Sequence, residues 1–156
     1  MRPPMLLFVC TGNICRSPMA AAIAADEAKR AHLELDVESA GTGAFGGDPA
    51  TDRAREVLSS LGLSLDEHRS KPLAADAIER ATLVVCATAR HCASLLARFP
   101  SAAHKIRSFD ELTGLGDIPD PIGADLEQYE LVKDMLVRGV PRVLAALQVA
   151  QERKEK

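Results

Sequence analysis

The chain reads Met5-Leu6-Leu7-Phe8-Val9-Cys10-Thr11-Gly12-Asn13-Ile14-Cys15-Arg16-Ser17-Pro18 near its amino terminus. The unbroken hydrophobic run over 5–9 is typical of a strand buried on both faces of a parallel sheet. Ser17-Pro18 is typical of a helix start, because the N–H that proline lacks would have no partner in the first helical turn. Gly12 can adopt positive φ and Asn13 tolerates it, so a tight loop with inward-pointing N–H groups fits between strand and helix. Such loops bind anions.

Further strand and helix signals alternate along the rest of the chain. We predict strands over 35–40, 83–86 and 105–109, the first of them at an edge of the sheet. Helices are predicted near 52–61, with Leu61 on the buried face and Gly62 as C-terminal cap, over 90–99, and from Asp125 onward. Gly139 and Pro141 should bend or break the last helix, and 151–156 should form a frayed, charged tail. This alternation favours a doubly wound α/β sheet with helices on both faces.

Composition limits the function further. With 156 residues and 47% hydrophobic residues, the chain is predicted to form one globular domain over 1–156. The early hydrophobic run is too short for a signal peptide or a membrane span, so we expect a cytoplasmic protein that does not bind membranes. A net charge of −3 argues against nucleic acid as a partner. The four cysteines lack the spacing of zinc sites, so no metal is expected.

Cys10 and Arg16 carry the chemistry that this loop predicts. N–H dipoles, the neighbouring guanidinium and a helix N-terminus all favour a thiolate at Cys10. Arg16 can hold two oxygens of a phosphoryl group while the sulfur attacks phosphorus in line. Ser17 can donate a hydrogen bond to the sulfur. A cysteine at a strand end is more often a small buried hydrophobe, but that interpretation does not explain the spacing from Cys10 to Arg16 and Ser17.

Residues 9–18, with Asp120-Pro121 downstream and Ser39-Ala40-Gly41-Thr42 after the second predicted strand, resemble the low-molecular-weight protein tyrosine phosphatases. The resemblance implies four parallel strands in the order 2-1-3-4. It also implies two-step hydrolysis of phosphomonoesters through a phosphocysteine on Cys10, with no cofactor. Arg16 would bind the phosphoryl group in both steps, together with the loop Thr11, Gly12, Asn13, Ile14, Cys15 and Ser17.

The same resemblance makes Asp120 the general acid and then the general base. Spacing alone does not distinguish it from Asp110 or Asp117. Most Asp-Pro pairs are simple turn residues, but the stretch 113–124 is long and rich in glycine and proline, which is itself typical of a functional loop.

Further site residues are implied by the resemblance. Asn13, Ser17, Ser39 and His68 would hold the loop in shape, although His68 could equally be a solvated loop histidine. Ile14, Phe45 and Ile122 would line the substrate cleft, where the alternative for Phe45 is an ordinary core residue. Cys15 could form a reversible disulfide with Cys10, or could simply pack inward.

The substrate predicted first is phosphotyrosine in a protein, with the enzyme a monomer or weak dimer. Ile14 is the residue of the tyrosine-type relatives, whereas those that dephosphorylate arginine have threonine there. In the family this position commonly has an aromatic side chain, and here it is Ile122. The cleft therefore has less aromatic surface to stack on phosphotyrosine. Protein-arginine phosphatase therefore stays an alternative, as does a thioredoxin-linked arsenate reductase using Cys10, Cys86 and Cys92. A catalytically dead phosphate-binding module is disfavoured, because Cys10, Arg16 and Asp120 are all present.

Overall fold

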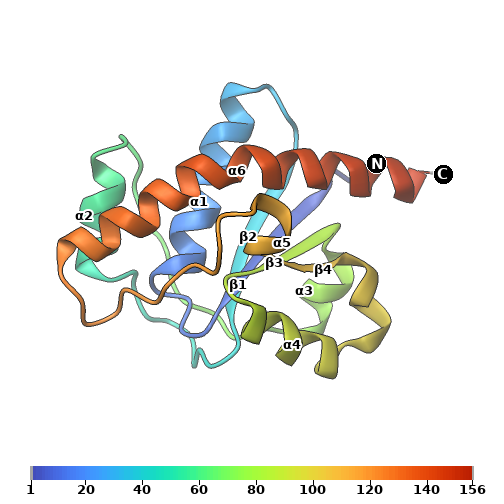
Figure 1. Ribbon diagram of the computed structural model, residues 1–156, viewed down its shortest axis with the longest axis horizontal. Coiled ribbons are helices and arrows are strands. Elements are labelled where there is room, and N and C mark those ends of the chain that lie inside the picture. Colours follow the sequence, from blue (N-terminus) through green and yellow to red (C-terminus); the bar gives the residue numbers. More distant parts are fainter. Residues whose placement is uncertain (1, 156) are drawn as a thin grey trace.

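A four-stranded parallel sheet forms the centre of the computed structural model, which describes residues 2–155 (Figure 1). The strands are β1 (Met5–Cys10), β2 (Asp36–Gly41), β3 (Leu83–Cys86) and β4 (Ile106–Ser108). Their order is β2-β1-β3-β4, and every neighbouring pair is parallel. The predicted strand order and the edge position of the second strand are confirmed. Because all four strands are parallel, their carboxyl ends lie at the same end of the sheet, and Cys10 is the last residue of β1 at that end.

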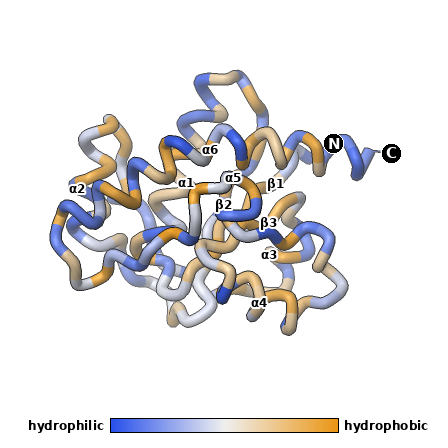
Figure 2. Tube along the Cα trace, in the orientation of Figure 1, coloured by the Kyte–Doolittle hydropathy of each residue, from blue (hydrophilic) through white to orange (hydrophobic). Residues whose placement is uncertain are grey.

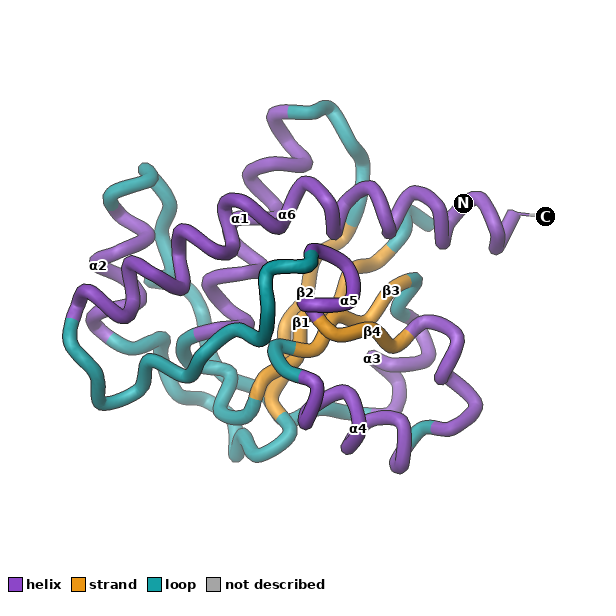
Figure 3. The backbone as a smooth tube through the Cα atoms, viewed as in Figure 1, coloured by secondary structure: helices purple, strands orange, loops and turns teal. Residues whose placement is uncertain are grey.

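Helices cover both faces of the sheet (Figure 3). They are α1 (Arg16–Arg30), α2 (Asp52–Ser59), α3 (Ala75–Arg80), α4 (Ala89–Arg98), α5 (Phe109–Thr113) and α6 (Leu126–Glu155), with a 3₁₀ helix, η1, at Pro100–Lys105. One face packs against α1, α2, α5 and α6, and the other against α3 and α4. Of the helices in the described part of the chain, none has a stretch hydrophobic and long enough to cross a membrane.

The alternation of side chains along β1 divides the core in two. Leu6 and Phe8 pack under α1 and α6, whereas Leu7 and Val9 pack against α3 and α4. All six residues of β1 are buried, as expected for a central strand of a parallel sheet. β1 is therefore held from both sides, which fixes the position of the loop that follows it.

We predicted that Gly139 and Pro141 would bend or break the last helix. Helix α6 runs unbroken from Leu126 to Glu155, so the break does not occur. Hydrophobic residues recur along the helix in Figure 2, and the stripe includes Val132, Leu136, Val140 and Val143, all fully buried. Packing of this stripe outweighs the hydrogen bond that Pro141 removes, which costs about 3 kcal/mol. The predicted frayed tail is also wrong for 151–155, which continue the helix, and Lys156 lies outside the described residues.

Other element boundaries differ in informative ways. The strand predicted over 105–109 ends at Ser108, because Ser108 and Glu111 form a capping box that starts α5. Helix α2 ends at Ser59, and Leu61 is 40% exposed and not on the buried face. The chain turns at Gly62 in the left-handed conformation, with Leu63 N–H donating to the Leu58 carbonyl, as the predicted glycine cap requires.

Candidate active site

The loop between β1 and α1, residues 10–17, is called here the Cys10 loop. Helix α1 starts at Arg16 with no side-chain cap and no acidic residue in its first turn, so its N–H groups are available to an anion. The left-handed conformation falls on Asn13, with φ 58°, and not on Gly12. The Cys10 side chain lies at the base of the loop and is only 2% exposed.

Asn13 ties the Cys10 loop to its surroundings. Its Nδ2 donates to Ser17 Oγ at 2.8 Å and to Ser39 Oγ at 2.9 Å, and its Oδ1 accepts from the Lys71 N–H at 2.9 Å. The side chain is fully buried. One residue therefore connects the loop, strand β2 and the segment that follows α2.

Ser17 links this network to the sulfur. Its Oγ lies 2.9 Å from Cys10 Sγ. Because the same oxygen accepts from Asn13 Nδ2, its own hydrogen is free to point at the sulfur. A hydrogen bond of this kind stabilises a thiolate over a thiol.

His68 supports the loop from outside. Its Nε2 lies 2.7 Å from the Asn13 carbonyl oxygen, which can only accept, so the ring donates. Burial lowers the pKa of His68, and the hydrogen bond to Asn13 opposes this shift. The ring thus contacts the Cys10 loop and is not a freely solvated histidine.

Gly41 closes the loop against β2. A Cβ at this position would lie 2.4 Å from the Thr11 carbonyl oxygen, which no side chain tolerates. The following N–H groups of Thr42 and Gly43 donate to the Cys10 and Thr11 carbonyls, both at 2.9 Å. Glycine is required here because the two backbones approach so closely.

The loop between α5 and α6, residues 114–125, is called here the Asp120 loop. Arg16 Nη1 donates to the Ile118 carbonyl at 3.1 Å, and Arg16 Nη2 lies 3.7 Å from Asp120 Oδ2. Arg16 is buried, whereas the Asp120 side chain is 49% exposed. Asp120 therefore faces both the guanidinium and solvent, a position from which a carboxyl group can exchange protons with a bound substrate.

The other two acids considered from the sequence have different partners. Asp110 Oδ1 accepts from the Gly116 N–H at 2.8 Å, and Asp117 Oδ1 accepts from the Ala89 N–H at 3.0 Å. Each of these carboxylates accepts from a backbone N–H that lies outside the Cys10 loop. Within the described residues, the carboxylate paired with Arg16 is that of Asp120.

The predicted cleft residues lie on separate segments. Phe45 is 97% exposed, so it is not a core residue, and Ile122 is 55% exposed. Ile14 is half-buried and packs against the hydrophobic core. The role of these three apolar side chains in the substrate cleft stays a prediction.

His91 was missed by the sequence analysis. This buried side chain at the start of α4 places Nε2 2.7 Å from Thr11 Oγ1 and Nδ1 2.8 Å from Thr88 Oγ1. The one available signal was Thr88 three residues before His91, a spacing typical of a helix N-cap.

The remaining cysteines are buried thiols. Cys15 Sγ lies 3.4 Å from Tyr129 Oη and 3.6 Å from Thr51 Oγ1, and burial raises the pKa of Cys15. Burial likewise raises the pKa of Cys86 and of Cys92. All three thiols therefore stay protonated at neutral pH.

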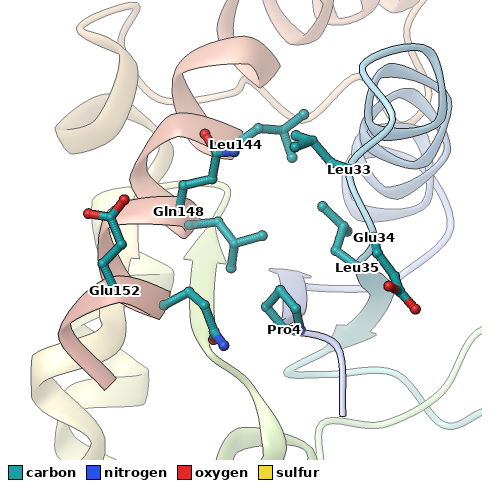
Figure 4. Close-up of a pocket in the computed structure, with 9 residues that line it drawn as sticks. Pro4, Leu33, Glu34, Leu35, Leu144, Gln148 and Glu152 are labelled. Atoms are coloured by element: carbon teal, nitrogen blue, oxygen red, sulfur yellow. The ribbon is translucent and has the colours of Figure 1, made fainter. Parts of the chain in front are cut away.

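A pocket at the opposite end of the sheet does not belong to this site (Figure 4). Pro4, which precedes β1, and Leu35 line one side of it, and the α6 residues Leu144 and Gln148 line the other. Since β1 runs from Met5 to Cys10, the pocket and Cys10 lie at opposite ends of the strand. The lining residues include no cysteine, histidine or arginine, and the chemistry described above is confined to the other end.

Comparison with known proteins gives a consistent result. The family model described as low molecular weight phosphotyrosine protein phosphatase matches residues 5–154. A protein-arginine-phosphatase of Geobacillus stearothermophilus is 38% identical, over 96% of this chain and 99% of the relative. A probable low molecular weight protein-tyrosine-phosphatase, EpsP, of Ralstonia solanacearum is 35% identical, over 90% of this chain and 96% of the relative. The structure of a low molecular weight protein tyrosine phosphatase from T. tengcongensis superposes with a TM-score of 0.88, at 36% identity, covering 92% of this chain and 99% of that one.

Proposed function

The chain belongs to the low-molecular-weight phosphotyrosine protein phosphatase family, and from this premise we propose that it hydrolyses phosphotyrosine in proteins through a phosphocysteine on Cys10. One arrangement carries the proposal. Cys10 Sγ lies 2.9 Å from Ser17 Oγ in the loop whose Arg16 pairs with Asp120 at 3.7 Å. A nucleophile, a group that binds phosphate oxygens and a proton donor thus surround one position.

In the first step the Cys10 thiolate attacks phosphorus and forms the S–P bond. The bond from phosphorus to the tyrosine oxygen breaks, and Asp120 gives its proton to that oxygen. Arg16 holds two of the remaining phosphoryl oxygens, and N–H groups of the loop from Thr11 to Ser17 bind the charge that develops. The products are the free tyrosine side chain and phosphocysteine.

In the second step a water molecule attacks phosphorus, and the Asp120 carboxylate takes its proton. The S–P bond breaks, phosphate leaves and Cys10 returns to the thiolate. The hydroxyl of Ser17 stabilises this leaving group through its contact with the sulfur. Asp120 ends the cycle protonated and ready for the next substrate.

Ile14, Phe45 and Ile122 form the substrate cleft in this proposal. An isoleucine at position 14 suits an aromatic ring and offers no hydroxyl to a guanidinium. A second candidate substrate is phosphoarginine, since a 38% identical relative is named a protein-arginine-phosphatase. The chemistry at Cys10 would be the same, with an arginine nitrogen as leaving group.

Regulation and location complete the proposal. Cys15 is a candidate resolving thiol: peroxide would oxidise the Cys10 thiolate to a sulfenic acid, which would then condense with the Cys15 thiol to a disulfide and release water. We place the protein in the cytoplasm, where thiols such as its four free cysteines stay reduced. Its partner is a phosphorylated protein, and we propose a monomer or weak dimer.

Hydrolysis of para-nitrophenyl phosphate, a phosphotyrosine peptide and a phosphoarginine peptide tests the proposal. We expect the wild type to favour phosphotyrosine and Cys10→Ser to be inactive on all three substrates. Ile14→Thr is the matched variant for specificity and should raise the relative activity on phosphoarginine. A wild type that prefers phosphoarginine would overturn the substrate assignment, and activity that survives in Cys10→Ser would overturn the mechanism.

A further inference from the structure

Residues 87–91, which comprise the turn after β3 and the first three residues of α4, contact both loops of the site. The Ala87 N–H donates to the Val9 carbonyl at the end of β1, and the Ala87 carbonyl accepts from the Ile118 N–H, both at 2.9 Å. The Ala89 N–H donates to Asp117 Oδ1 at 3.0 Å. Two adjacent residues of the Asp120 loop are thus attached to this segment.

His91 extends the same segment to the Cys10 loop. Burial lowers the pKa of His91, so the ring is neutral at pH 7 and carries one hydrogen. Thr88 Oγ1 accepts from the backbone N–H of His91 at 3.2 Å, and the Thr88 hydroxyl hydrogen can point at His91 Nδ1. In the tautomer in which Nδ1 accepts from Thr88, Nε2 carries the ring hydrogen and donates to Thr11 Oγ1 at 2.7 Å.

Asp120 depends on its loop for its position. Its Oδ1 accepts from the nearby Ile122 N–H at 3.1 Å, and its Oδ2 faces Arg16 at 3.7 Å. Half of the side chain is exposed to solvent, so packing contributes little to its placement. The attachments at Asp117 and Ile118, three and two residues earlier, are the nearest fixed points of the loop on that side.

We propose that residues 87–91 form a bracket that sets the distance between the Asp120 loop and the Cys10 loop, with Asp117 and His91 as positioning residues. The proposal rests on the function proposed above, because it assigns the bracket to the placement of the acid against the phosphoryl group. Asp117 acts through Asp120, and His91 acts through Thr11. Neither side chain touches the reacting atoms.

The Asp117 arm is tested with two leaving groups. Phenyl phosphate needs the proton from Asp120 more than para-nitrophenyl phosphate does, and kcat/KM reports the step that forms phosphocysteine. Asp117→Ala should lower kcat/KM for phenyl phosphate about tenfold more than for para-nitrophenyl phosphate, part of the effect of losing a general acid. Asp117→Asn keeps an oxygen that accepts from Ala89 and should stay within about twofold of wild type, since a neutral hydrogen bond replaces a charge-assisted one.

Asp110→Ala is the matched control for that arm. It removes a hydrogen bond of the same kind as that of Asp117: the Gly116 N–H, in the same loop, donates to Asp110 Oδ1, and α4 is not involved. We expect Asp110→Ala to reduce stability and to leave the ratio of the two substrates unchanged. A selective effect on phenyl phosphate in both alanine variants would mean that the loop is simply sensitive to any lost contact, and would overturn the bracket.

The His91 arm is tested by inhibition with inorganic phosphate. His91→Leu should raise the inhibition constant by up to about tenfold, the value of one hydrogen bond, with little dependence on the leaving group. His91→Gln can donate to Thr11 from its amide and should restore phosphate binding. If His91→Leu does not fold, Thr11→Val removes the same bond from the other side.

The outcomes separate the bracket from the proposed function. Suppose that wild-type activity requires Cys10. Then equal losses on both substrates in Asp117→Ala, or no rescue by Asp117→Asn and His91→Gln, would overturn the bracket alone. Hydrolysis that does not require Cys10 would overturn the proposed function first. A selective loss on phenyl phosphate in Asp117→Ala that Asp117→Asn restores, together with weaker phosphate binding in His91→Leu that His91→Gln restores, would support both.

Discussion

Asn13 is fully buried, and Asn13→Ala should destabilise the protein by about 4 kcal/mol. Three side-chain hydrogen bonds are lost, at 2.8, 2.9 and 2.9 Å, and each contributes about 1 kcal/mol. Alanine must also adopt φ 58°, which costs about 1 kcal/mol more for a residue with a Cβ of this kind. The sum is a large part of the stability of a domain of this size.

Asn13→Gly separates the two contributions. Glycine adopts positive φ freely, so it should lose about 3 kcal/mol, the hydrogen-bond part alone. Ser39→Ala removes one of the three bonds and should lose about 1 kcal/mol. Equilibrium unfolding in urea at pH 7 measures all three variants, and unchanged m-values show that the same transition is compared.

Activity provides a second measurement on the same variants. Without Asn13, Ser17 loses the donor that orients its hydroxyl toward Cys10, so kcat should fall in Asn13→Ala and in Asn13→Gly alike. The reasoning would be refuted if Asn13→Ala cost less than about 1 kcal/mol, or if the alanine and glycine variants were equally stable. Either result would mean that the loop keeps its shape without this network.

Three further changes have definite expected results. Asp120→Ala should lower kcat/KM for phenyl phosphate by about a hundredfold or more and for para-nitrophenyl phosphate much less, and full activity on phenyl phosphate would show that another group is the acid. Gly139→Ala should lower the free energy of unfolding by about 1 to 3 kcal/mol, because its Cβ would lie 2.3 Å from Cζ of the fully buried Phe109; thermal unfolding with unchanged or higher stability would contradict this packing. Glu38→Gln should destabilise the protein at pH 7, since the hydrogen bonds from Arg80 and Lys71 lower the pKa of Glu38 to about 2. A lowered carboxyl pKa gives stability that is complete above the unfolded value of about 4.3 and is lost as the pH falls toward about 2. The free energies of unfolding of wild type and Glu38→Gln, measured in urea, should therefore converge over that pH range. A constant difference between them would refute the assignment.

Local signals account for the parts of the fold that the sequence predicted. Three features depend on neighbours in the chain: the hydrophobic run of β1, the start of α1 within two residues of Ser17-Pro18, and the left-handed turn at Gly62. The capping box at Ser108 and Glu111 was equally local, and it would have ended the predicted strand at Ser108 and indicated α5, which we did not predict. Pro141 misled the analysis because its effect is set by tertiary packing of α6, which no local pattern reveals.

In the candidate site, too, the residues that are close in the sequence could be predicted, and those that only the fold brings together could not. Cys10 and Arg16 are close in the sequence, and the loop between them follows from a strand, a turn and a helix. Asp120 could not be distinguished from Asp117 by spacing, because the choice depends on how a long loop crosses the end of β3. His91 was invisible for the same reason, since its partner Thr11 lies 80 residues earlier in the chain.

Identification of the residue that carries the phosphoryl group during turnover tests the central claim most directly. Wild-type protein is quenched in acid while it hydrolyses para-nitrophenyl phosphate, and the phosphorylated peptide is located by mass spectrometry, with Cys10→Ala as control. We expect a phosphoryl group on Cys10 in the wild type, and neither phosphorylation nor hydrolysis in Cys10→Ala. A phosphoryl group on another residue, or turnover by Cys10→Ala at the wild-type rate, would contradict it.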